Sequence, residues 1–223
     1  RMRDILDANA IFYDNGVYSS YAEDVFMFSV TPNLNPTVRV RVSKNNLETR
    51  TLFQPGFVWV PGGGFYAEAI YGLSTNEFGD IAQEGSLEGV RETDDSTASI
   101  KVKGNYNHAT GFWYVIPSAY FEWYVLPQYA PKLGYYYGHY SDGIDAHTVL
   151  LENTYALQKR FFFTLVSSGV LSFDDGQTAW EWSAGLKLRA KITSSLSLKY
   201  LIIYHGLEHS QGLENGLTVD WKF

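Results

Sequence analysis

Apolar and polar side chains alternate along much of this chain, and the alternation is strictest between residues 179 and 192. A β-strand points successive side chains to opposite faces, whereas a helix would repeat its apolar positions about every 3.6 residues. The run therefore predicts a strand with one apolar face and one mainly polar face. The apolar face carries Trp180, Trp182, Ala184, Leu186, Leu188, Ala190 and Ile192, and the other carries Glu181, Ser183, Gly185, Lys187, Arg189 and Lys191.

Comparable runs recur from one end of the chain to the other. They are separated by turn sequences such as Asp14-Asn15-Gly16 and Asp174-Asp175-Gly176, whose Asn and Gly residues tolerate the backbone angles of tight turns. No stretch requires a helix of ordinary length. We expect strands within residues 6–13, 17–31, 37–43, 49–60, 65–71, 96–106, 111–126, 133–140, 146–157, 161–173, 179–192, 196–205 and 217–223.

One stretch, residues 74–96, breaks the pattern. It is rich in acids and contains a single base, Arg91. Three of the acids, Glu84, Glu88 and Glu92, are spaced four apart, which would also suit one face of a short helix. A dense group of like charges is more often solvated than packed, so we expect an acidic loop here.

The last nine residues, 215–223, form an amphipathic strand with a terminal aromatic residue. Leu217, Val219, Trp221 and Phe223 share one parity, and Thr218, Asp220 and Lys222 share the other. This ending resembles the last strand of bacterial outer-membrane β-barrels. The resemblance implies that the four apolar residues are recognised by the barrel-assembly machinery, and that lipid and lipopolysaccharide surround the protein. It also implies that the strand ends in the periplasm, with Thr218, Asp220 and Lys222 in the lumen beside Asp7 and Asn9.

Three features favour a membrane barrel over a soluble sandwich. Many runs are long enough to cross a bilayer at a tilt, and charges occur in mid-strand on the polar face only. Aromatic residues, which make up 17% of the chain, gather toward strand ends, as in Trp59, Trp180, Trp182, Tyr204 and Trp221. We therefore predict an all-β fold, a closed antiparallel transmembrane β-barrel of about 12 strands, within a range of about 10 to 14, because such barrels usually have an even number.

Composition adds constraints on setting and partners. We expect residues 1–223 to form a single domain located in the bacterial outer membrane, and the start at Arg1-Met2-Arg3 resembles a trimmed terminus. The sequence leaves open whether an upstream domain or a periplasmic partner exists. Cysteine is absent, so neither disulfides nor thiolate ligands are available. The net charge of −7 and the lack of a basic cluster argue against nucleic-acid binding.

Charge on the polar face supplies the functional hypothesis. Bases recur there in mid-strand, while we expect most acids at loops and rims, so the lumen should favour anions. We predict a passive channel for small anionic hydrophilic solutes. The alternative is a lumen closed by ion pairs to Glu68, Glu152, Glu181 and Asp220, with a structural, anchoring or export role. The predicted lumen residues are Arg39, Arg41, Glu68, Lys101, Lys103, Glu181, Lys187, Arg189, Lys191 and Lys199.

An enzyme is a further alternative, based on histidines near two predicted outer turns. His139 and His147 flank Ser141, Asp142 and Asp145, while His205 and His209 lie near another turn. Some outer-membrane barrels are hydrolases with such rim sites, and a base beside a nucleophile is the minimum requirement. Neither group has the spacing of a known hydrolase or metal motif. We therefore predict no catalytic residues, no metal and no cofactor.

Overall fold

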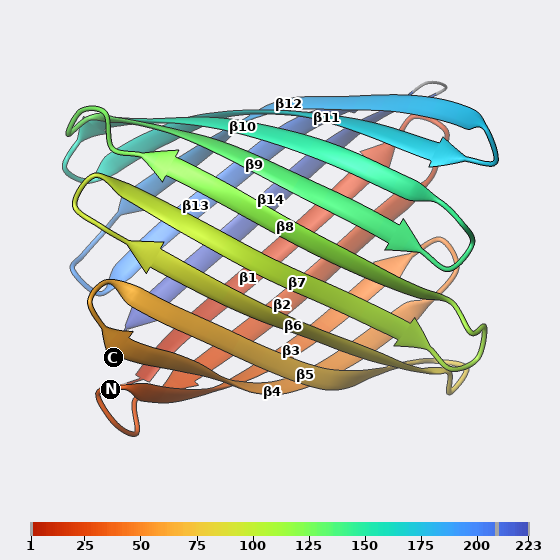
Figure 1. Ribbon diagram of the computed structural model, residues 1–223, viewed down its shortest axis with the longest axis horizontal. Helices are drawn as coiled ribbons and strands as arrows, with labels where there is room; N and C mark the ends of the chain where they lie inside the picture. Colours follow the sequence, from red (N-terminus) through yellow and green to blue (C-terminus); the bar gives the residue numbers. More distant parts are fainter. Residues whose placement is uncertain (1, 208–209, 223) are drawn as a thin grey trace.

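The computed structural model describes residues 2–207 and 210–222, and every regular element in them is a β-strand of 11 to 15 residues. Figure 1 shows them tilted against the long axis of the molecule. The strands are β1 Met2–Tyr13, β2 Tyr18–Phe28, β3 Leu34–Asn45, β4 Thr49–Gly62, β5 Phe65–Asn76, β6 Ile81–Glu92, β7 Ser96–Asn107, β8 Trp113–Trp123, β9 Tyr129–Tyr140, β10 Asp145–Gln158, β11 Phe161–Asp174, β12 Gln177–Lys191, β13 Leu196–Gly206 and β14 Gln211–Lys222.

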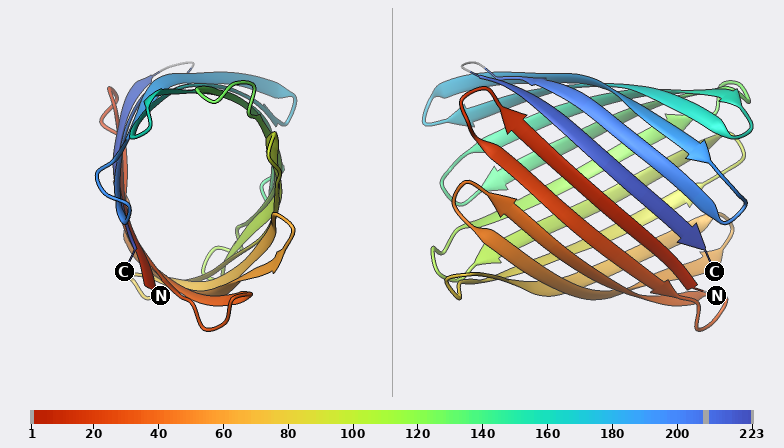
Figure 2. Two further views of the ribbon diagram at one scale, coloured as in Figure 1. Left: turned by 90° about the vertical axis from the view of Figure 1, so that its left-hand side faces the viewer. Right: turned by 180° about the vertical axis from the view of Figure 1, so that it is seen from behind.

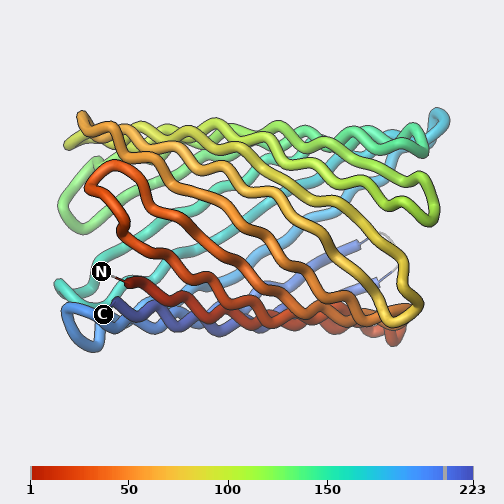
Figure 3. Tube along the Cα trace, turned by 90° about the horizontal axis from the view of Figure 1, so that it is seen from below, coloured from red at the N-terminus to blue at the C-terminus, as the bar shows by residue number. Residues whose placement is uncertain are grey.

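The strands close into one antiparallel barrel. Each pairs with the strands before and after it, and β14 pairs with β1. At this closure Thr218 lies opposite Asp7 and donates a 2.8 Å hydrogen bond to its carboxylate, which confirms the position predicted for Thr218. Both chain ends reach the same end of the barrel, which we call the terminus end (Figures 2 and 3). The predicted closed barrel is confirmed, but it has 14 strands rather than about 12.

The missed strand is β6, which lies in the stretch predicted to be an acidic loop. That prediction was wrong because the outward positions of β6 include Gly85 and Gly89, so its outer face gives little apolar signal. Glu84, Glu88 and Glu92 instead share the lumen face of this strand. The last strand, expected within residues 217–223, is also longer than predicted, since β14 begins at Gln211 and brings Glu214 into the barrel wall.

The outer face is mainly apolar, as a bilayer requires. Asp4, Asp24 and Arg91 also lie on it, toward the terminus end, so the prediction that mid-strand charges occur on the polar face only was not fully correct. Trp180, Leu165 and Trp221 are about half exposed on it, at 57%, 50% and 49%. Within the described ranges, no helix is long and apolar enough to cross a membrane. Leu217 and Val219 share this face with Trp221, whereas Phe223, the fourth residue predicted to engage the assembly machinery, lies outside the described residues.

Lumen-facing side chains of β3–β7 pack against one another, and we call this region the packed wall. Leu52, Gln54 and Val90 are almost wholly buried there, at 2%, 0% and 0% exposure. Gln54 reaches from β4 across β5 and donates a 3.2 Å hydrogen bond to the backbone carbonyl of Glu84 on β6. It can do so because Gly72, the β5 residue between them, has no side chain. Seen from one end, the ring of strands is oval, and the turns lie at its rims (Figure 2).

The packed wall predicts a strong effect of Gly72→Ala. An added Cβ would lie 2.0 Å from the Phe53 carbonyl oxygen and 2.6 Å from the Gln54 Cα, so the β4–β5 pairing must shift. We expect the free energy of unfolding in lipid vesicles to fall by about 1–3 kcal/mol, as for other overpacked sites. In the control Gly216→Ala, the new Cβ meets its nearest atoms at 3.4 Å, an ordinary contact. Equal stability of the two variants would contradict this view of the packed wall.

Candidate functional site

The strand register defines which side chains face the lumen. Directly paired residues share a face, so Asp7 shares the lumen face with Glu23, and Glu23 shares it with Arg41. Followed around the ring, this parity places all ten predicted lumen residues on the inner face. Whether any of them binds a solute stays a prediction. The same face carries three bases that the sequence reading did not single out, Arg3, Arg50 and Lys132.

Acids occupy the lumen more heavily than the sequence indicated. The prediction that most acids lie at rims overlooked β6, which contributes three of them, and also Glu23 and Glu214. The described lumen-facing acids of the strands are Asp7, Glu23, Glu68, Glu84, Glu88, Glu92, Glu122, Glu152, Asp174, Glu181, Glu214 and Asp220. The total number of lumen bases therefore says little about selectivity, and the pairing of each base decides its contribution.

On the packed wall, bases are neutralised by neighbouring carboxylates. Glu84 forms ion pairs with Arg41 at 3.0 Å and Lys103 at 3.6 Å, linking β3, β6 and β7. Arg39 pairs with Glu23 at 3.4 Å. Two bases predicted to attract anions, Arg39 and Arg41, are thus held by acids. Their main effect is to fasten the packed wall.

Three further lumen bases are paired, Lys101 on the packed wall and Lys132 and Lys187 on β9 and β12. Lys187 forms an ion pair with Glu152, which also binds Lys132 at 3.5 Å, and Lys101 binds Glu88 at 3.1 Å. Of the acids predicted to close the lumen, Glu152 and Asp220 do form ion pairs, the latter with Arg3 at 2.7 Å. For Glu68 and Glu181, the described part of the chain offers no ion pair within 4.0 Å.

Arg189, Lys191 and Lys199 differ from these bases, and we call them the basic cluster. Among residues 2–207 and 210–222, no carboxylate lies within ion-pair distance of any of the three. They occupy the terminus end of β12 and β13, with Arg189 directly opposite Lys199 in the register. The guanidinium of Arg189 and the ammonium of Lys191 lie 4.4 Å and 5.2 Å from the ring centre of Phe162. The cluster is the least neutralised group of bases in the described lumen.

The lumen retains free volume beside the basic cluster. A cavity of about 730 Å³ is bounded by β8–β14, β1 and β2, with one contribution from β6. Its lining includes Thr154 and Thr164, whose hydroxyls are 2.9 Å apart, and two members of the basic cluster, Arg189 and Lys199. A second space of about 440 Å³ continues toward the terminus end. The packed wall therefore fills one side of the oval lumen, while the side from β8 to β14 keeps this free volume.

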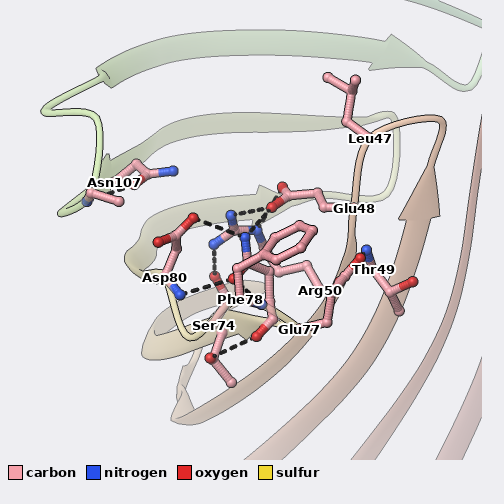
Figure 4. Close-up of polar contacts among 12 residues, drawn as sticks. Leu47, Glu48, Thr49, Arg50, Ser74, Glu77, Phe78, Asp80 and Asn107 are labelled. Atoms are coloured by element: carbon pink, nitrogen blue, oxygen red, sulfur yellow. Dashed lines mark hydrogen bonds and ion pairs between the residues drawn. The ribbon is translucent and has the colours of Figure 1, made fainter.

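At the end opposite the termini, polar contacts fix two turns above the packed wall. Figure 4 shows the guanidinium of Arg50 donating to the carboxylate of Glu48 at 2.8 Å and 3.0 Å. Asn76 also donates to Glu48 at 2.6 Å, and the Thr49 amide donates to Glu77 at 2.6 Å. The hydrogen bonds from Arg50 lower the pKa of Glu48 below its ordinary value. This network joins the β3–β4 and β5–β6 turns, so this part of the rim is held in place.

Among the described residues, no histidine hydrogen-bonds a serine or threonine hydroxyl. His139 shares a 2.7 Å hydrogen bond with Asp145 on the outer face, and His147 shares one of 2.7 Å with Tyr135. The Ser141 hydroxyl instead accepts a 3.0 Å hydrogen bond from the Trp113 amide. His205 faces the lumen and bonds Glu214 at 2.8 Å, whereas His209 lies outside the described residues. In the described part of the chain, no group of three or more His, Cys, Asp or Glu residues could hold a metal ion.

Comparison with solved structures identifies the class of fold. A structure titled "Bacterial polysaccharide outer membrane secretin" matches with a TM-score of 0.74 at 11% identity, covering 99% of this chain and 98% of that one. The "CymD monoaromatic hydrocarbon channel" matches with a TM-score of 0.77 at 8% identity, covering 100% and 88%. The "KdgM porin in complex with disordered oligogalacturonate" matches with a TM-score of 0.52 at 11% identity, covering 98% and 99%.

These structures show that the chain has the fold of bacterial outer-membrane β-barrels, and the apolar outer face agrees with that location. No protein-family model matches the sequence, and no curated protein matches it. Because the identities are low, the shared feature is the barrel itself. Substrate preference has to be argued from the lumen of this chain.

The ion pairs around Glu84 predict a stability contribution that Glu84→Gln would remove. Arg41 and Lys103 would lose their shared negative partner while staying partly buried, at 24% and 36% side-chain exposure. Allowing for this exposure, we expect the free energy of unfolding to fall by about 1–3 kcal/mol. Urea unfolding in lipid vesicles, followed by tryptophan fluorescence, would measure it. The control is Glu92→Gln, which breaks no described ion pair and should cost less than about 0.5 kcal/mol. Equal losses would show that the Glu84 pairs contribute little.

Proposed function

We propose that this protein is an outer-membrane channel through which small hydrophilic solutes diffuse passively, anions in preference to cations. The observation that carries the proposal is the hollow side of the lumen, a 730 Å³ cavity whose lining includes Arg189 and Lys199. Unneutralised bases beside a water-filled path raise the local concentration of anions. Two of the structural neighbours bear the words channel and porin in their titles, which supports passage as the role of this barrel shape.

The position of the charges supports a modest preference. Acids line the same cavity, since Glu92 and Glu122 contribute to it together with Asp7. Asp7 is engaged by the Tyr21 hydroxyl at 2.8 Å and by Thr218 at 2.8 Å. The β12–β13 side of the cavity therefore attracts anions, while the opposite side admits cations. We expect the lumen to discriminate by charge without excluding either sign.

Planar bilayers containing the purified protein test the proposal. We expect stepwise increases in current, and a reversal potential in a KCl gradient that indicates chloride passing roughly 2- to 5-fold faster than potassium. The preference should weaken at high salt, because screening shortens the reach of the basic cluster. Bilayers that stay silent would contradict the channel and favour a closed barrel with a structural role. Selectivity for potassium would contradict the anion preference alone.

A further inference from the structure

The basic cluster carries an energetic cost that no ion pair in the described lumen offsets. Arg189 and Lys199 are direct cross-strand partners, and like charges in that position repel each other. Lys191 adds a third positive charge two residues further along β12. Other lumen bases, such as Arg41 and Lys187, each meet a carboxylate. An arrangement of this kind is stabilised when an anion occupies it.

The cluster is positioned as a binding site would be. Phe162 provides a ring against which both Arg189 and Lys191 lie, so two of the three cations are held toward one point. The Arg189 Nε atom is buried and has no hydrogen-bond partner. A buried donor left unpaired costs free energy, which an acceptor from a ligand would recover. The unpaired donor is a second observation, independent of the charge count, that points to a ligand.

A pocket of the right kind adjoins the cluster. The 440 Å³ space at the terminus end is lined by all three cluster members and by the serines of the β12–β13 turn and the start of β13. Lys222 and the Arg3–Asp220 ion pair complete the lining. Arg189 and Lys199 also line the larger cavity, so the pocket and the main path meet at these two residues. The cluster therefore lies where the two spaces meet.

The facing wall has the opposite charge. Glu92 on β6 and Glu122 on β8 line the larger cavity, and in the described structure neither has an ion-pair partner within 4.0 Å. In the closed ring of fourteen strands, β6 lies opposite β13, which carries Lys199. Anions are thus repelled from one wall and attracted to the other. The charges confine an anion to the side where the cluster and the hydroxyl groups are.

We propose that Arg189, Lys191 and Lys199 form a binding site for a small oxyanion with more than one negative charge, of the phosphate or polycarboxylate class. Three cations without a carboxylate partner match a multivalent anion better than chloride, and the serine hydroxyls supply donors for its remaining oxygens. The inference rests on the proposed channel function and adds a specific site to it. Passing chloride and binding an oxyanion are separate properties, so they can fail separately.

Two measurements with inorganic phosphate and citrate as probes test the site. In planar bilayers, we expect citrate to reduce the chloride current in a saturable way at constant ionic strength, and phosphate to do so more weakly. Calorimetric titration of the detergent-solubilised protein should show citrate binding without any need for conduction. Lys199→Gln and Lys191→Gln should each weaken citrate binding about tenfold, through loss of a charge-assisted hydrogen bond. Lys199→Arg keeps the charge and should retain binding.

Arg91→Gln is the matched control. Arg91 is a base at the same end of the barrel, but it shares the outer face with Phe65 and Ala98, so removing its charge should leave citrate binding unchanged. Channels that conduct yet neither bind citrate nor lose current would overturn the site and leave the channel intact. Equal binding by wild type and both Gln variants would also overturn it. Citrate binding that depends on Lys199 in a protein that never conducts would instead refute the channel and keep the site.

Discussion

Closure of the β1–β14 seam is the constraint on which the rest of the structure depends. In a bilayer, water is not available to unpaired backbone groups, so a sheet can span it only when both of its edges are joined. Here the seam runs over the whole length of both strands, from Arg3 opposite Lys222 to Tyr13 opposite Gly212. Once the ring is closed, the parity of every strand is fixed by its neighbour. The apolar set must face lipid and the polar set must face the lumen.

Given a closed ring, the lumen has to accommodate many charged side chains, and it does so unevenly. The packed wall neutralises its charges around Glu84, where Arg41 and Lys103 converge, and Gln54 fills the gap left by Gly72. Beside β8–β14, the lumen remains hollow. The three bases of the basic cluster remain unneutralised there. Selectivity therefore follows from which bases lack a partner, and the number of bases in the lumen is a poor guide to it.

The sequence was sufficient for most of the fold because a membrane barrel displays its architecture as alternation. Runs such as 179–192 could be assigned to strands and faces directly, and the lumen face of Arg39, Lys101 and Lys199 followed from parity. The strand β6 was missed because Gly85 and Gly89 occupy its lipid side, leaving its acids without an apolar counterpart. Periodicity detects a contrast between faces, and this strand has little contrast.

The candidate site could be predicted only in part. Parity gives the face of a residue but not its partners, which come from distant strands, as when Arg41 on β3 meets Glu84 on β6. Parity alone therefore does not distinguish Arg189 from Arg39, Arg41 and Lys187. In the described structure, only Arg189 of these four bases has no carboxylate within ion-pair distance. The mistaken loop at residues 74–96 added to the error, because that stretch holds Glu84 and Glu88, the acids that pair with Arg41, Lys103 and Lys101.

The central claim is that the lumen is hollow along β8–β14 and filled along β3–β7, and single-cysteine labelling tests it most directly. The chain has no cysteine, so Thr164→Cys and Ser74→Cys each introduce a unique thiol on the lumen face. Thr164 lines the 730 Å³ cavity, whereas Ser74 is only 5% exposed. The account predicts that a charged, water-soluble thiosulfonate reacts with Cys at position 164 and reduces the single-channel current, while position 74 stays unmodified. Rapid labelling at position 74, or none at position 164, would contradict it.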